Sequence, residues 1–360
     1  MSRRLYVPFD VFAMQEDVSV STLVRDGSLG WTCGQCPLDR EGHVVAPNDL
    51  MAQARFVCDM LESVVPRGGF DQAEIGKLNV YFAENAPGDG AAALAVIRDR
   101  NPQALVLPIR VPHFYYDGMM IEVDVFAATG AQRRHASSAS SAIEVVDADD
   151  VTWAFVQARP EKDQTLAEAV TDIEATLRSE NLYAHNLISD QWFATRFLAG
   201  SADTVPATGG SAFISLAEGM VLCEGQAHGL VAAELAFSRR DVSVGEAGDR
   251  SREGRLYVRD DGVQRVVTGI HADPQGDLVS QTSAIMSRIS EDLESAGMSF
   301  ANVVKLTAHY VGGASAEELH GNMKVRHGHY RKPGPASTGL PVASLLDKDC
   351  RIAIAVMAVR

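Results

Sequence analysis

Long apolar runs are missing from this sequence of 360 residues. No segment approaches about 18 consecutive apolar residues, the length that a membrane-spanning helix needs. Met1-Ser2-Arg3-Arg4 is followed by only a short apolar stretch, which Asp10 interrupts, whereas a signal peptide has a longer apolar region and a small-residue cleavage site. We therefore expect a cytoplasmic protein that makes no contact with a membrane.

Cysteine is also scarce, with five residues in the chain. A small, odd number of cysteines favours reduced intracellular thiols over a disulfide framework. Cys33 and Cys36 form a C-x-x-C pair, but no second such pair follows, so a zinc or redox site is a minor alternative. The remaining cysteines are Cys58, Cys223 and Cys350.

Positive charge is in short supply, because 32 basic residues face 47 acidic ones and the formal net charge is −15. The basic clusters Arg133-Arg134 and Arg239-Arg240 are only dipeptides. A nucleic acid would be repelled by the summed field unless basic residues were concentrated on one face. The sequence therefore argues against nucleic-acid binding and leaves a small molecule as the expected partner.

An internal repeat is the most informative feature of the sequence. Hydrophobic residues make up 46 % of the chain, as in a soluble globular protein, and the length suits two or three domains. The segments Gln53–Phe82 and Gln281–Tyr310 both predict an amphipathic helix, a glycine that ends it, and an alternating strand. Gln53 precedes Lys77 and Gln281 precedes Lys305 by the same 24 residues.

A fainter third copy lies between these two. Val151–Ala158 alternates as a strand, the apolar period of 166–177 predicts a helix, and Ser211–Leu216 and Leu230–Phe237 predict two further strands. The segments 130–141 and 245–254 have the composition of joins. We predict an α+β fold with three units, each a sheet with helices on one face. Their boundaries are 1–132, 140–243 and 250–360.

The first and third units resemble the YjgF/RidA family. "WTCGQCPLDREGHVV" from Trp31 is similar to the family's strand ending in Ser-Gly-Gln-x-Pro, and "IGKLNVYF" from Ile75 is similar to its next strand. In the third unit, "NMKVRHGHY" from Asn322 and "PGPASTGLPV" from Pro333 look like the family's second helix and the strand after it. These motifs cover about two-thirds of the chain, and the middle unit is placed by pattern and length alone.

The resemblance implies a chorismate-mutase-like fold that assembles as a trimer with ligand clefts between neighbouring subunits. Three copies in one chain would form a covalent pseudo-trimer, because short links raise the effective concentration of the units to the millimolar range. The three clefts could then diverge independently. Further association of pseudo-trimers stays open.

The resemblance also implies imine or enamine hydrolysis, for which the family uses an arginine in Pro-x-Arg-Ser and a glutamate on the last strand. An arginine matches a carboxylate bidentately, and a carboxylate can act as a general base. In the third unit these positions hold Ser337 and Ala355, and in the middle unit Glu234 falls at the glutamate position. In the first unit Asp124 falls at that position, and Arg110 follows Pro108 in a Pro-x-Arg segment.

Other polar residues are candidates for binding. Ser337 and Thr338 could donate hydrogen bonds to a ligand, although a plain strand-start position is equally consistent with the pattern. Asn322 and Arg326 share a helix face at i and i+4, and Tyr115 lies beside an Asp-Gly turn signal, so all three could line a cleft or the surface. His327 and His329 would diverge on a helix, which argues against a shared metal.

We therefore expect a hydrolase or deaminase for a small anionic or carbonyl metabolite. Its cleft would join Arg110, Asp124 and Tyr115 of the first unit to a neighbour that offers Glu234, Ser337 or Thr338. No metal and no organic cofactor are expected, since the sequence has no phosphate-binding glycine loop. Two alternatives remain, namely a non-catalytic binding protein that kept the fold and a ring-opening amidohydrolase with three related domains.

Overall fold

The computed structural model describes residues 4–14, 16–83, 90–159, 166–182, 187–195, 220–223, 230–239, 245–246, 255–260, 265–272, 275–312, 316–345 and 349–360. These residues form a mixed α+β fold, as the sequence predicts. The helices are α1 (Leu50–Arg67), α2 (Gly90–Arg100), α3 (Leu166–Ser179), α4 (Leu278–Ser295) and α5 (Ala316–Gly328).

The strands form three sheets. The first contains, in spatial order, β1 (Leu5–Pro8), β2 (Ser21–Asp26), β3 (Leu29–Thr32), β6 (Ile121–Ala128), β4 (Ile75–Ala83) and β5 (Leu105–Val111). The second contains β7 (Gln132–Ser137), β8 (Ser141–Ala148), β9 (Val151–Ala158), β12 (Leu230–Ser238), β10 (Leu187–Thr195), β11 (Met220–Cys223) and β18 (Ser344–Leu345). The third contains β13 (Gly245–Glu246), β14 (Arg255–Asp260), β15 (Arg265–Ala272), β19 (Ile352–Val359), β16 (Val303–Tyr310) and β17 (Ala336–Pro341).

All three sheets follow one strand order. Two consecutive hairpins lead to the last long strand of the unit, and the strand that follows the first helix pairs antiparallel with it. That strand also pairs in parallel with its other neighbour, as β4 does with β5, β10 with β11, and β16 with β17. Equivalent positions can therefore be read from the strand pairing without any sequence alignment.

Two details of the sequence reading change. The expected join at 130–141 contains β7, whose pairing with β8 places it in the second sheet. Its polar sequence, QRRHAS, hid it because four of its six residues are charged or hydroxylic and it carries no alternating apolar residues. The strand expected at Ser211–Leu216 lies outside the described residues.

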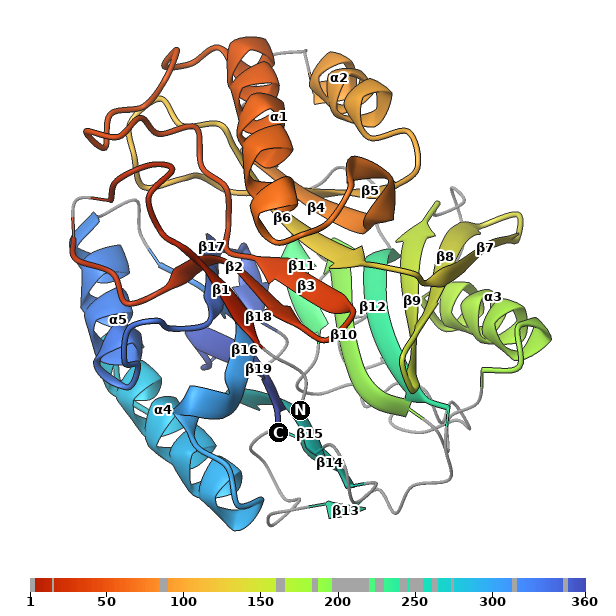
Figure 1. Ribbon diagram of the computed structural model, residues 1–360. Coiled ribbons are helices and arrows are strands. Elements are labelled where there is room, and N and C mark those ends of the chain that lie inside the picture. Colours follow the sequence, from red (N-terminus) through yellow and green to blue (C-terminus); the bar gives the residue numbers. More distant parts are fainter. Residues whose placement is uncertain are drawn as a thin grey trace.

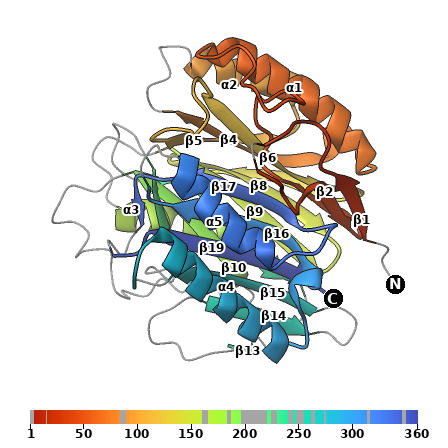
Figure 2. The same ribbon diagram turned by 90° about the vertical axis from the view of Figure 1, so that its left-hand side faces the viewer.

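The sheets face one another at the centre and the helices lie on the outside (Figures 1 and 2). One apolar cluster draws side chains from all three sheets, among them Trp31 and Phe126 of the first, Trp153 and Phe155 of the second, and Leu340 of the third. The helices cover the outer faces, where α1 and α4 pack on their own sheets and α3 packs on the second.

The two glutamines of the repeat make equivalent contacts in their own sheets. Gln53 is fully buried, donates to the carbonyls of Ala46 and Gly118, and accepts from the backbone N–H of Met120. Gln281 makes the same three kinds of bond, to Gly276, Asp349 and Arg351. Each glutamine therefore ties the loop before its helix to the loop before the last strand, and satisfies buried backbone groups that would otherwise be costly.

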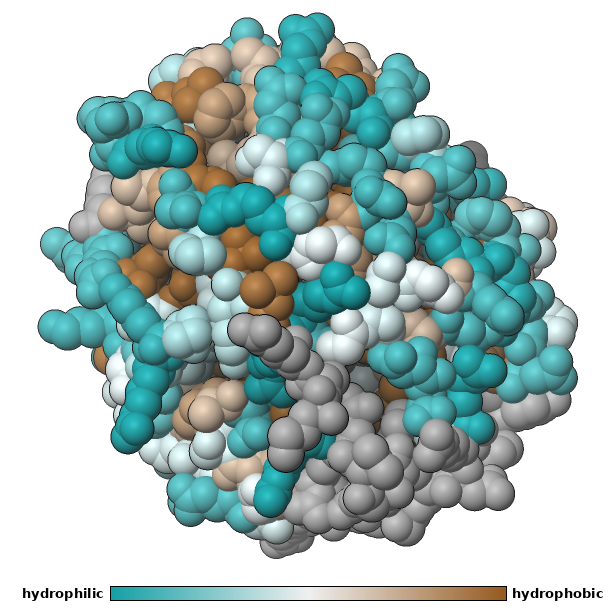
Figure 3. All heavy atoms as spheres, viewed as in Figure 1, coloured by the Kyte–Doolittle hydropathy of each residue, from teal (hydrophilic) through white to brown (hydrophobic). Residues whose placement is uncertain are grey.

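The face of the molecule in Figure 3 is mostly hydrophilic, and its hydrophobic atoms form separate small patches. None of the described helices has both the length and the apolar character needed to cross a membrane.

Candidate functional site

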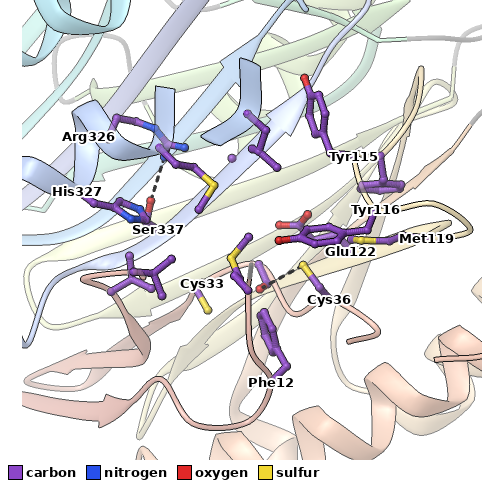
Figure 4. A pocket seen from close by; sticks show the side chains of 18 of the residues that line it. Phe12, Cys33, Cys36, Tyr115, Tyr116, Met119, Glu122, Arg326, His327 and Ser337 are labelled. Carbon is purple, nitrogen blue, oxygen red and sulfur yellow. Dashed lines mark hydrogen bonds between the residues drawn. The ribbon is translucent and has the colours of Figure 1, made fainter. Parts of the chain in front are cut away.

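A pocket lies between the first sheet and the helix–strand pair α5 and β17 of the third (Figure 4). Its empty volume is about 630 Å³, including the part open to solvent. Arg326, His327 and Ser337 lie on one side in Figure 4, and Glu122, Tyr116 and Met119 lie on the other. Apolar residues of the segment between β1 and β2 complete the wall, namely Phe9, Phe12, Met14, Val18 and Val20.

Glu122 is the acidic group of this pocket. It lies on β6 and is only 6 % exposed. Burial, together with the negative charge of Asp124, raises the pKa of Glu122 to about 8, because both disfavour a second buried anion. Gly34 makes room for it, since a Cβ at that position would lie 1.6 Å from Glu122 Oε1. At neutral pH the carboxyl is therefore protonated and can donate a proton into the pocket.

Arg326 supplies positive charge on the opposite side. Its side chain is 2 % exposed, and Nε and Nη2 donate to Asn322 Oδ1 at 3.1 and 2.9 Å while Nη1 donates to Ser337 Oγ at 3.3 Å. Within the described ranges no carboxylate lies at ion-pair distance from this guanidinium. A buried, uncompensated guanidinium is an anchor for a carboxylate or another small anion.

The remaining pocket groups are neutral. Burial and the charge of Arg326 lower the pKa of His327 to about 3, so its imidazole is uncharged. Burial raises the pKa of the Cys33 thiol to about 12, which argues against a reactive thiolate. Tyr115, from the loop after β5, stacks on Tyr310 of β16 with ring centroids 5.6 Å apart. The pocket therefore offers one cation, one proton donor and an apolar wall.

Asp124, which was expected in the cleft, lies in a second group of buried charges, which we call the central cluster. Lys305 Nζ donates to Asp124 Oδ2 at 3.2 Å, to Thr338 Oγ1 at 2.6 Å and to the carbonyl of Thr32 at 2.8 Å. Burial raises the pKa of Asp124, but Lys305 and Lys77 lower it by more, and the net pKa is below the usual value. The structure thus brings Asp124 and Thr338 together, as partners of Lys305 and not as lining of the pocket.

Glu234 belongs to the same cluster. Lys77 Nζ lies 2.8 Å from Glu234 Oε1 and 3.8 Å from Asp124 Oδ1. The ion pairs link neighbouring sheets in order, Lys305 of the third to Asp124 of the first, and Lys77 of the first to Glu234 of the second. Asn79 also donates to Glu234.

Arg110 lies apart from both groups. It is exposed on β5, with its guanidinium 5.5 Å from the centroid of the Phe82 ring. Ser337 pairs with Leu306 of β16, and the residue that pairs with the equivalent Leu78 of β4 is Val106. Arg110 therefore stands four residues beyond the position of Ser337, and the structure does not place it with Asp124. Its catalytic role stays a prediction.

Of the predicted binding residues, the pocket unites Tyr115, Arg326 and Ser337, while Asn322 holds Arg326 from behind. Glu122 was missed, although it stands two residues before Asp124 on the same face of β6. Strand pairing sets Glu122 opposite Tyr81, and the equivalent positions in the other sheets hold Ala232 and Ala353. Of these three corresponding positions, only the one in the first sheet carries an acidic residue.

In the part of the chain that the structure describes, His, Cys, Asp and Glu side chains form no group of three or more that could hold a metal ion.

Comparisons with known proteins give no match at the level of sequence, since neither a family model nor a curated protein matches the chain. Among solved structures, a chorismatase aligns with 79 % of this chain and 93 % of its own length, at 12 % identity and a TM-score of 0.50. This likeness concerns the fold.

Proteins of the Rid type match shorter stretches of the chain. The YjgF gene product of E. coli covers 35 % of this chain and 98 % of its own length, at 22 % identity and a TM-score of 0.29. The Rid-family protein YyfB of Yersinia pestis covers 35 % of this chain and 98 % of its own length, at 23 % identity and a TM-score of 0.27.

Proposed function

We propose that this protein is a hydrolase of small carboxylates, in which Arg326 holds the carboxylate and Glu122 acts as a general acid. The observation that carries the proposal is the pairing, in one pocket, of a buried guanidinium without an ion-pair partner in the described residues and a buried carboxyl with a pKa of about 8. A raised carboxyl pKa near the working pH suits an acid catalyst.

The reaction class follows from these two groups. Suitable substrates carry an enol ether or an imine at the sp² carbon adjacent to the carboxylate. Glu122 can protonate the methylene carbon of the enol ether or the nitrogen of the imine. Protonation makes the carbon adjacent to the carboxylate electrophilic, water then adds to it, and the adduct collapses with loss of an alcohol or ammonia. For an enolpyruvyl ether or for 2-iminopropionate, the carbonyl product is pyruvate. Glu122 regains a proton from the water that adds.

Chorismate and 2-iminopropionate are the substrates to test first. Chorismate carries an enolpyruvyl ether, and the chorismatase likeness over most of the chain supports trying it. 2-Iminopropionate represents the imine chemistry that the Rid resemblance implies. A shared fold does not establish a shared activity, so the choice between them belongs to the experiment.

Both substrates can be followed through one product. Pyruvate release is measured with lactate dehydrogenase and NADH for the wild-type protein, the Arg326→Met variant and buffer alone. We expect the wild type to release pyruvate from one substrate faster than buffer, and Arg326→Met to raise KM by at least roughly 10-fold through loss of a charged hydrogen bond. If neither substrate reacts faster than in buffer, the chain is better described as a binding protein.

We further propose that the three sheets are three divergent copies of one domain, arranged as a covalent pseudo-trimer with one working cleft. Their common strand order supports this arrangement. Glu122 has alanine at both equivalent positions, Ala232 and Ala353, so a proton donor of this kind stands in the first unit alone. Glu122→Ala should therefore abolish all turnover, and residual activity would point to a second cleft.

A further inference from the structure

We propose that Asn322 is a positioning residue that holds the Arg326 guanidinium with a neutral acceptor and so leaves its charge for the ligand. This role rests on the proposed function, because it concerns the same carboxylate anchor. It differs from the direct ligand contact that the sequence suggested for Asn322.

The contacts around Asn322 are specific. Its Oδ1 accepts hydrogen bonds from both Nε and Nη2 of Arg326, at 3.1 and 2.9 Å. Its Nδ2 donates to the carbonyl of Glu318 one turn earlier on α5, at 3.1 Å, which fixes the direction of the amide. Asn322 is fully buried, and it does not line the pocket, so it acts on a ligand only through Arg326.

The choice of an amide over a carboxylate has an electrostatic consequence. An aspartate would accept the same two N–H groups with nearly the same shape, and it would also neutralise the guanidinium. A buried charge normally has a partner, because an unpaired one is costly. An amide in this place satisfies the N–H groups while it leaves the net charge of the pocket positive.

Ser337 completes the cradle without changing its charge. It accepts from Arg326 Nη1 at 3.3 Å, and a Cβ on Gly339, two residues further along β17, would lie 3.0 Å from Nη2. The guanidinium therefore rests against a hydroxyl, an amide and a bare backbone, and each of these partners is neutral. The positive charge that the third unit lacks on strand β17 is supplied beside it from helix α5.

The decisive variant is Asn322→Asp. Binding of benzoate, pyruvate and neutral benzamide is measured by titration calorimetry, and thermal unfolding is measured without ligand. We expect the wild type to bind the two anions but not benzamide, and Asn322→Asp to bind the anions at least roughly 10-fold more weakly. We also expect a higher melting temperature for this variant, because the buried guanidinium gains a charged partner. The lost hydrogen bond to the carbonyl of Glu318 reduces this gain.

A matched control is Asn101→Asp. Asn101 is 4 % exposed and donates to the carbonyl of Ile97 one turn earlier at 2.9 Å, and no arginine hydrogen bond to its amide oxygen is found in the described structure. A carboxylate there should lower the melting temperature and leave benzoate binding unchanged. Opposite thermal shifts in the two variants would show that Arg326 was the uncompensated charge.

The outcomes separate this inference from the proposed function. If the wild type binds neither anion, the carboxylate pocket itself is wrong, and the role of Asn322 falls with it. If the wild type binds benzoate and Asn322→Asp binds it equally well, only the role of Asn322 is wrong. An Asn322→Asp protein that unfolds, or that is destabilised as much as Asn101→Asp, also overturns the inference. Asn322→Ala is a second variant, and unchanged benzoate binding there would likewise contradict it.

Discussion

Two groups of buried charge lie in the interface between the first and third sheets, and they are satisfied in different ways. In the central cluster, Lys305 donates to Asp124, Thr338 and the backbone of Thr32, so all three of its N–H groups have acceptors. In the pocket, the partners that hold Arg326 among the described residues are all neutral, and Glu122 stays protonated. The first group is neutralised within the protein, whereas the positive charge of the second has no counter-charge among the described residues.

Whether the protein itself supplies a counter-charge separates buried charges that stabilise the fold from those that are available for binding. A paired charge stabilises one arrangement of the chain, and removing one partner leaves the other stranded. An unpaired charge is costly to the fold and persists where a function needs it. The ion pairs that join Lys305 to Asp124 and Lys77 to Glu234 therefore hold neighbouring sheets together, while Arg326 and Glu122 are the groups that we propose act on a substrate.

The variant Glu122→Gln tests whether Glu122 serves turnover and not the stability of the fold. Glutamine has nearly the shape of the protonated acid and cannot ionise in the unfolded chain, so the free energy of unfolding at pH 7 should rise, not fall. Turnover should fall by about 10²- to 10⁴-fold, the usual contribution of a general acid. Pyruvate release and urea unfolding at pH 7 test the two halves. Normal turnover would show that another group donates the proton.

The central cluster predicts the opposite pattern for Lys305→Met. Among the described residues, loss of the lysine leaves Asp124 with Lys77, 3.8 Å away, as its ion-pair partner, and should lower the free energy of unfolding by roughly 3–5 kcal/mol. Urea denaturation measures this, and Lys332→Met is the control, because its ion pair with Asp17 is exposed and should have no measurable effect. Equal stability of the two variants would contradict a structural role for the cluster.

Gly34→Ala tests whether turnover depends on the position of the Glu122 carboxyl. The new methyl group would lie 1.6 Å from Glu122 Oε1 and must displace the carboxyl. Displacement by about 1 Å can lower turnover as much as about 100-fold. Gly328→Ala is the control, since its Cβ meets nothing within 4 Å. If the two variants turn over substrate equally fast, the carboxyl has no fixed catalytic position.

Much of the fold could be read from the sequence, because the repeat is enforced by local contacts. Gln53 and Gln281 satisfy equivalent backbone groups in their own units, and the spacing to Lys77 and Lys305 reflects the same helix and strand. Asp124, Glu234 and Ala355 pair with Asn79, Gln191 and Thr307, at corresponding places in the common strand order of the three sheets. The periodicity of a single unit determines each of these features.

The site depended on contacts between units, which no local pattern contains. Glu122 and Asp124 share one face of β6, and only the third unit decides that one faces the pocket and the other meets Lys305. The sequence named Arg326 as a candidate. Its guanidinium reaches Ser337 only because α5 packs beside β17, which the sequence does not show. Strand β7 escaped notice because its polar side chains lack a period.

We also expect a pH dependence that only the pocket should show. Because burial and Asp124 raise the pKa of Glu122 to about 8, the acid form predominates at pH 7 and is lost as pH rises through that value. Turnover should therefore be level below pH 7 and fall above pH 8. The same raised pKa means that folding stability conferred by the protonated group declines between about pH 4.5 and pH 8, since the unfolded carboxyl ionises first. Urea unfolding of the wild type should show this decline relative to Glu122→Gln, and parallel curves would place the titrating acid elsewhere.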